Sequence, residues 1–180
     1  MGRFQLKRGQ IAIGATALVV LVAAGLAMAI SNKSGGPITA VRAVESSTPE
    51  STSSATFVDV PGAQTPPVSV AAGRTALMLV RFSAESACGG PGANDTGCLV
   101  RIMLRRVGAE QEALPVTNDF FFDEDKSTFV PGEREARSMD RWRVVGPGTW
   151  TARVQFRVED TQNTFILDDW SLILERSDRG

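Results

Sequence analysis

The sequence predicts an all-β protein, an antiparallel β-sandwich of jelly-roll-like type, preceded by one N-terminal transmembrane or signal helix. Three observations lead to this fold class. After residue 55, apolar and polar side chains alternate with a period of two, as in strands with one buried face. Gly- and Pro-containing turn sequences separate these segments, and no helical periodicity follows residue 31. The stretch from Ile11 to Ile30 carries no charged residue.

The composition excludes several classes of function. The chain has 180 residues, no His, two Cys and a formal net charge of −1. A chain without His has no Ser-His-Asp or Cys-His relay and no His-ligated metal, and two Cys are too few for a four-thiolate zinc site. Near-neutral charge argues against general nucleic-acid binding. We therefore expect a non-enzymatic protein with no catalytic residue, no cofactor and no nucleic-acid partner.

The N-terminal segment predicts a membrane location. Residues 1–10 are basic and residues 11–30 are apolar. As a helix, residues 11–30 would be about 30 Å long, which matches the hydrocarbon core of a bilayer. The basic flank places residues 1–10 in the cytoplasm, so the protein would cross the cell membrane once, with the rest outside.

A second interpretation of the same segment stays open. Ala27-Met28-Ala29 has the small-x-small pattern of a signal-peptidase site. Cleavage near Ala29 would release a secreted protein. The long apolar run favours the uncleaved anchor, since cleaved signals usually have shorter apolar cores.

Residues 31–54 are interpreted as a linker. They begin with SNKSGGP, which contains no large apolar side chain that could pack in a core. The weak alternation of residues 38–44 leaves an early strand as the alternative. The sandwich domain is assigned to residues 55–178.

Four segments of the domain have clear strand patterns. They are residues 77–85, 98–106, 150–158 and 164–176. The side chains expected to face inward are Met78, Val80, Phe82, Ala84, Cys98, Val100, Ile102, Leu104, Trp150, Ala152, Val154, Phe156, Val158, Ile166, Trp170, Leu172 and Leu174. A β-bulge is expected at Asp168-Asp169, where the alternation slips. Residues 141–145 and 150–158 are expected to form a hairpin around Gly146-Pro147-Gly148.

The two cysteines are predicted to form a disulfide. Cys88 and Cys98 flank the turn-forming sequence GGPGANDTG. Outside the cell membrane such thiols oxidise, and the bond would connect the ends of two neighbouring strands. A redox pair is the alternative, but the spacing is not that of a CxxC motif.

Two further features are candidates for ligand contacts. Asp123 and Asp125 stand at a spacing that suits a weak calcium site, and the alternative is a solvated turn. Trp142, between Arg141 and Arg143, is the tryptophan with the best chance of exposure, and it could stack on a sugar ring.

Three stretches together resemble a group of small exported bacterial proteins. They read VRFSAESACGG…GCLVRIML, RSMDRWRVVGPGTWTARVQFRV and FILDDWSLILER. The resemblance covers roughly residues 56–176. It implies export and a single β-sandwich behind a signal or anchor helix, and it implies no catalytic residue.

These observations predict a membrane-anchored extracytoplasmic domain that binds an unknown protein or glycan, or that serves as a structural part of the envelope. A secreted carbohydrate-binding module is the alternative. Homo-oligomers are common among jelly-roll domains, so self-association is a further expectation from fold analogy.

Overall fold

The computed structural model describes residues 35–90, 97–114, 121–124 and 133–179. Within these ranges, no helix has the length and apolar character needed to cross a membrane. The predicted segments 1–10 and 11–30 lie outside the described residues.

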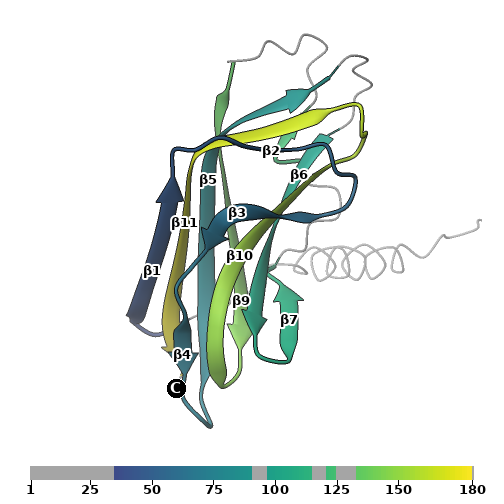
Figure 1. Cartoon of the computed structure of the whole chain (residues 1–180). Coiled ribbons are helices and arrows are strands. Elements are labelled where there is room, and N and C mark those ends of the chain that lie inside the picture. Colours follow the sequence, from purple (N-terminus) through teal and green to yellow (C-terminus); the bar gives the residue numbers. More distant parts are fainter. Residues whose placement is uncertain (1–34, 91–96, 115–120, 125–132, 180) are drawn as a thin grey trace, which may run out of the picture. The chain divides into compact units, whose positions relative to one another are not determined.

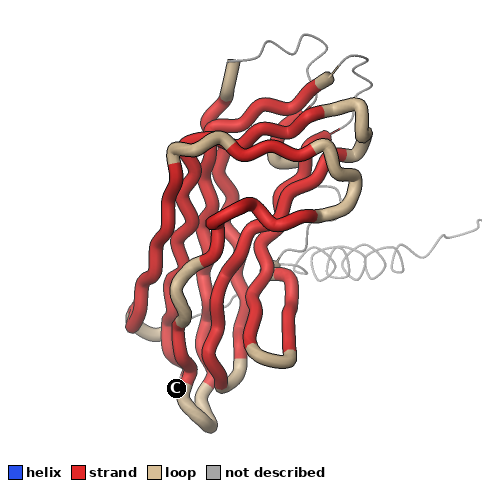
Figure 2. Tube along the Cα trace, viewed as in Figure 1, coloured by secondary structure: helices blue, strands red, loops and turns tan. Residues whose placement is uncertain are grey.

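The fold is an all-β, antiparallel, two-sheet sandwich, as predicted (Figures 1 and 2). The first sheet has five strands, in the order β1 (Ile38–Ser46), β11 (Thr164–Arg179), β5 (Thr75–Gly89) and β9 (Glu135–Val145), with β2 (Glu50–Thr52) also paired to β11. The second sheet has six strands, in the order β3 (Val58–Gln64), β10 (Gly148–Val158), β6 (Gly97–Arg106) and β7 (Ala109–Glu112). In addition, β4 (Val68–Val70) pairs with β10, and β8 (Asp123–Glu124) pairs with β6.

The core lies between the sheets, where side chains from both inner faces meet. The inward-facing residues predicted for β5, β6 and β10 are all buried. Phe82, Phe122, Phe165 and Phe156 form a chain of tilted ring contacts across the core, with centroids 5.7–6.3 Å apart. Trp150 is buried and donates its indole N–H to the Gly146 carbonyl at 3.0 Å. The period of two therefore identified the buried faces of these strands correctly.

The segment 31–54 is not a linker throughout. Residues 38–46 form β1, which pairs with β11 from Ile38–Ser177 to Ser46–Trp170, and β2 also pairs with β11. Ala40 and Val44 pack against the core at the edge of the first sheet. The early strand was the correct alternative, because β11 offers a long unpaired edge that β1 and β2 fill.

The hairpin predicted around Gly146-Pro147-Gly148 does not form. β9 pairs with β5 in the first sheet, whereas β10 pairs with β3, β4 and β6 in the second. The turn therefore connects the two sheets. Gly148 has φ +136°, a conformation that L-residues rarely adopt, and it redirects the chain between layers.

The predicted bulge in β11 is present, but Ile166 was assigned to the wrong face. The register against β5 shifts between Asp168 and Ser171, and Asp169 has φ 41°. Phe165 and Leu167 are buried before the bulge, and Trp170, Leu172 and Leu174 are buried after it. A bulge inserts an extra residue, so the odd-numbered side chains face the core before it and the even-numbered ones after it. Ile166 therefore does not face the core and is only half-buried.

Candidate functional site

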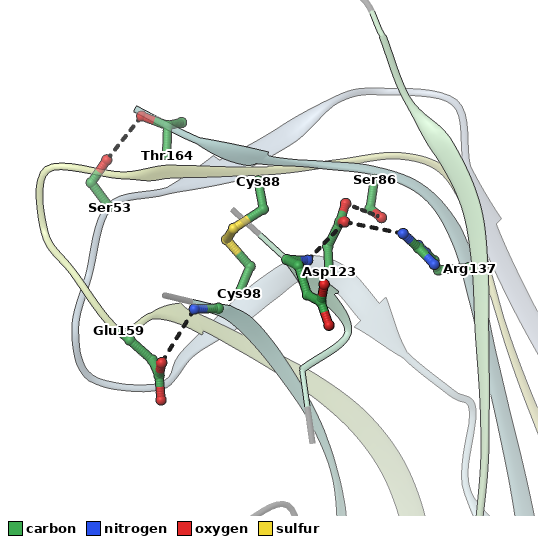
Figure 3. The surroundings of a disulfide bond; sticks show 10 residues. Ser53, Ser86, Cys88, Cys98, Asp123, Arg137, Glu159 and Thr164 are labelled. Atoms are coloured by element: carbon green, nitrogen blue, oxygen red, sulfur yellow. Dashed lines mark hydrogen bonds and ion pairs between the residues drawn. A yellow bond between two sulfur atoms is a disulfide. The ribbon is translucent and has the colours of Figure 1, made fainter. Parts of the chain in front are cut away.

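The Cys88–Cys98 disulfide joins the two sheets (Figure 3). Its Cα atoms are 5.9 Å apart, and both residues are buried. Cys88 lies near the end of β5 in the first sheet and Cys98 near the start of β6 in the second. The predicted bond is confirmed, but the strands it connects belong to opposite layers and are not neighbours in one sheet.

Asp123 lies beside the disulfide and is held by protein donors (Figure 3). Its Oδ2 accepts the Ser86 hydroxyl at 2.8 Å, and its Oδ1 accepts the Glu124 N–H at 2.9 Å. Arg137 Nη2 is 3.5 Å from the same Oδ1. The carboxylate is buried, so Arg137 supplies the charge that a buried carboxylate requires.

Of the two residues of the predicted calcium site, the structure describes Asp123. Asp125 lies outside the described residues. Among the residues that the structure does describe, no group of three or more His, Cys, Asp or Glu side chains could hold a metal ion. Both oxygens of Asp123 already accept hydrogen bonds from protein groups.

Trp142 lies on the outer face of the first sheet. In β9 it is half-buried, it pairs with Leu79 of β5, and its backbone exchanges two hydrogen bonds with Leu114 at 2.7 and 2.9 Å. Val144 pairs with Leu77 in the same way, and all of these β5 and β9 side chains are half-buried. We call Leu77, Leu79, Trp142 and Val144 the outer apolar patch. Trp150 and Trp170 are buried in the core, as predicted.

Arginines on the outer face of the second sheet are paired with acceptors. Arg153 Nε is 2.7 Å from Glu110 Oε1, and Arg153 also pairs with Asp59. Burial alone would lower the pKa of Arg153, but the Glu110 and Asp59 carboxylates raise it above its ordinary value. Arg101 and Arg157 lie over the Phe57 ring, 4.1 and 5.2 Å from its centroid. This face is a network of satisfied charges.

One end of the sandwich collects arginines from distant parts of the sequence. The strand register brings together the β4–β5 turn, the β6–β7 turn, the β9–β10 turn and the end of β11, at the lower end in Figure 1. The arginines of this end are Arg74, Arg105, Arg106, Arg176 and Arg179. We call these five residues and the turns that hold them the basic end.

Two grooves lie at the basic end. One is lined by Ser69, Ala71, Arg74, Arg176, Asp178 and Arg179. The other lies along the β6–β7 turn, with Arg105, Arg106 and Val107 in its wall, together with Glu110, which pairs with Arg153. Arg176 pairs with Asp178 at 3.1 Å, and Arg106 donates to the Pro147 carbonyl at 2.8 Å. Arg74 and Arg105 are exposed.

The opposite end is rich in carboxylates. The register places the β10–β11 turn, the start of β9 and β8 together, and the acidic residues there are Glu124, Glu133, Glu135, Glu159 and Asp160. Glu159 accepts the Gly97 N–H at 3.2 Å. Arg134, Arg137 and Arg157 are the described arginines of this end. Arg134 and Arg137 pair with the carboxylates of Asp168 and Asp123, and Arg157 lies over the Phe57 ring. Charge is therefore distributed unevenly along the strand direction.

Sequence reasoning did not find the basic end. Arg74, Arg105 and Arg179 stand far apart in the chain: Arg74 precedes β5, and Arg105 and Arg179 lie at the ends of β6 and β11, whose partners were not predicted. The sequence pattern had placed Arg105 on the wet face of its strand, and nothing local to Arg74 or Arg179 relates either of them to it.

No model of a known protein family matches this sequence, and no curated protein matches it either.

Proposed function

We propose that this protein is a non-enzymatic, membrane-tethered extracytoplasmic β-sandwich that binds a protein or glycan, or that forms a structural part of the cell envelope. Residues 11–30 would be its membrane anchor. The Cys88–Cys98 disulfide is the observation that carries the proposal, because disulfides form and persist outside the reducing cytosol. The charge-free run from Ile11 to Ile30 supplies the route out of the cell.

We further propose that the sandwich is a jelly roll. The two sheets have the strand orders β1-β11-β5-β9 and β3-β10-β6-β7. The chain changes sheet repeatedly, at β2–β3, β4–β5, β5–β6, β8–β9, β9–β10 and β10–β11, as Greek-key connections around one core would require. Self-association of the domain remains a proposal from this fold analogy.

The pairing of two buried aspartates supports a non-enzymatic role. The Asp123 and Asp168 carboxylates are both buried, and each pairs with an arginine. Asp168 also accepts the Asp169 N–H at 2.9 Å, which helps to hold the bulge. These carboxylates thus serve the fold, and the sequence contains no His to act as a general base near neutral pH.

Fractionation of cells that express the full chain tests the location. We expect the protein in the membrane fraction, resistant to extraction by high salt and alkali and released by detergent. Protease added outside the cytoplasmic membrane should digest the sandwich. N-terminal sequencing distinguishes the two N-terminal interpretations, since cleavage after Ala29 would leave Ile30 as the first residue. Recovery of the intact chain in the cytosol would contradict the proposal.

A carbohydrate-binding module is the second candidate function. It is favoured by the position of Trp142, which is half-buried on an outer face while Trp150 and Trp170 lie in the core. Aromatic rings of this kind stack on sugars. Specific glycan binding that W142A abolishes and W142F preserves would support it. A glycan array without specific binding would remove it.

A further inference from the structure

We propose that the basic end of the sandwich docks on anionic phospholipid headgroups of the membrane that holds residues 11–30. The inference rests on the proposed membrane location and adds to it a contact surface and a partner. It predicts that the domain lies on the bilayer in one orientation and does not move freely on its tether.

The first described residues enter the sandwich at the basic end. The Gly36 N–H donates to the Asp178 carbonyl at 2.9 Å. Gly35 lies so close to the end of β11 that a Cβ on it would be 2.6 Å from Ser177 Cβ and 3.4 Å from Leu77 Cδ2. The chain thus reaches the sandwich beside Asp178 and Arg179, and an anchor upstream of Gly35 must approach from there.

The chain between the apolar segment and Gly35 is short. Only residues 31–34 separate Ile30 from Gly35. Fully extended, the path from Ile30 to Gly35 spans at most about 17 Å. The headgroup layer takes up roughly 5–8 Å of that distance. Gly35, at the basic end, is therefore held within roughly 9–12 Å of the headgroups, which is close to the Debye length of about 10 Å at 0.1 M salt.

The charge of this end suits an anionic surface. Arg74 and Arg105 are exposed, and Arg176 and Arg179 line a groove with Arg74. Asp178 is the acidic member of that groove, and it pairs with Arg176. Arg176 already donates to Thr39, Ser69 and Asp178, so the donors offered to a ligand are chiefly those of the exposed Arg74 and Arg105. Guanidinium groups bind phosphate oxygens through paired N–H donors, which lipid phosphates match.

Apolar side chains at the same end are exposed. Val107, at the tip of the β6–β7 turn, is fully exposed and directly follows Arg105 and Arg106. Ile38, at the start of β1, is 56% exposed. An apolar tip beside arginines is suited to the boundary between headgroups and acyl chains, where it loses contact with water.

The acidic opposite end favours one orientation and one partner. Glu124, Glu135 and Glu159 lie at the far end of the strands, where an anionic bilayer would repel them. A tethered domain with arginines toward the membrane and carboxylates away from it is therefore oriented by the surface potential. Lipid is favoured over a free acidic ligand because the tether keeps this end at the bilayer.

Brominated lipids in nanodiscs test the proposal on the full chain. A tryptophan reporter is introduced at the tip in V107W, and a matched reporter at the opposite end in Q162W, where the side chain is exposed. Both carry the three native tryptophans as a common background. In brominated phosphatidylcholine–phosphatidylglycerol discs we expect the added emission of V107W to be quenched and that of Q162W to be unaffected.

Neutralising the arginines tests the role of charge. We expect R74Q/R105Q, in the V107W background, to lose about five-fold per charge, or about 25-fold in all, in the ratio of docked to undocked domain. The matched control is R42Q/R81Q, which removes the same charge from exposed mid-strand positions and should leave quenching unchanged. The melting temperatures of both double variants show that each is folded.

The outcomes separate this inference from the proposed location. A chain that does not co-purify with nanodiscs contradicts the membrane anchor itself. An anchored chain in which V107W escapes quenching, or is quenched as strongly in discs of phosphatidylcholine alone, overturns the docking proposal and leaves the anchor standing. Equal loss of quenching in R74Q/R105Q and R42Q/R81Q also overturns it.

Discussion

Asp123 links the two sheets through the polar contacts beside the disulfide. It belongs to β8 of the second sheet. It accepts one hydrogen bond from Ser86 of β5 and pairs with Arg137 of β9, and both of these strands lie in the first sheet. Asp123 and Ser86 are both buried, so the loss of these contacts is costly. A buried hydroxyl without an acceptor has lost its bonds to water and gains none in return.

The variant D123A should lower the free energy of unfolding by about 1–3 kcal/mol. It leaves the Ser86 hydroxyl without its 2.8 Å acceptor and Arg137 without a buried counter-charge. Urea denaturation measures the change. The control is E124A, which removes the exposed neighbouring carboxylate and should change stability by less than about 0.5 kcal/mol. Equal losses in both variants would contradict the assigned role of Asp123.

Addition of calcium should not stabilise the protein. The Asp123 oxygens already accept protein hydrogen bonds, so a cation would have to displace Arg137 and Ser86. Melting curves in excess calcium and in EDTA should have equal midpoints. A midpoint that rises in calcium would support the site predicted at Asp123 and Asp125 and contradict this expectation.

At the scale of the element, the bulge in β11 decides which side chains face the core. Asp169 takes a φ of 41°, and Asp168 accepts the Asp169 N–H. Left-handed backbone is tolerated by Asp, Asn and Gly and is strained for β-branched residues.

The variant D169V should therefore cost about 1–2 kcal/mol of stability, whereas D169G and D169N should be nearly neutral. Thermal or urea unfolding of the three variants checks the order. Because Asp169 is exposed, the loss of buried contacts does not account for the difference. A D169V variant as stable as D169G would show that the positive φ is not required.

At the scale of the whole molecule, the disulfide joins the two layers at the end of the sandwich opposite the basic end. It connects residues with a sequence separation of 10, a short loop. Two hydrogen bonds lie around it (Figure 3). One joins the Ser53 and Thr164 hydroxyls, and in the other the Gly97 N–H donates to the Glu159 carboxylate. The disulfide should thus add to the free energy of unfolding the amount expected for closing a short loop, in addition to what the packed core contributes.

Reduction of the disulfide should lower the free energy of unfolding by roughly 2–3 kcal/mol without abolishing the fold. Urea titrations with and without reductant measure this value. In C88A/C98A the reductant should have no effect, which serves as the control. Thiol titration of the unfolded protein should find no free thiol before reduction, and two free thiols would contradict the bond.

The sequence predicted the buried face of each strand better than its partners. Val80 and Val154 face inward because alternation along a strand is a local property, visible within a few residues. The pairing of β9 with β5, rather than with β10, depends on residues some sixty positions away. A Gly-Pro-Gly turn suits a hairpin and a crossover between layers equally well, so the local sequence does not decide between them.

Of the candidate sites, the disulfide was predictable and the basic end was not. Cys88 and Cys98 have a sequence separation of only 10, so their meeting does not depend on distant strand pairing. Arg74, Arg105 and Arg179 converge only because β5, β6 and β11 run antiparallel in two stacked sheets. Their proximity is a consequence of topology, and no local pattern contains it.

The sequence by itself determined the all-β class, the inward faces of the main strands, the sulfur pair and the apolar segment. Each of these depends on neighbours within one turn or one strand. Only the tertiary structure decided the strand order, the parity across the bulge and the gathering of arginines at one end. The physical reason is that hydrogen bonds between strands connect residues distant in the chain. Several strand edges can pair with any one strand, and the sequence of that strand alone does not decide which of them does.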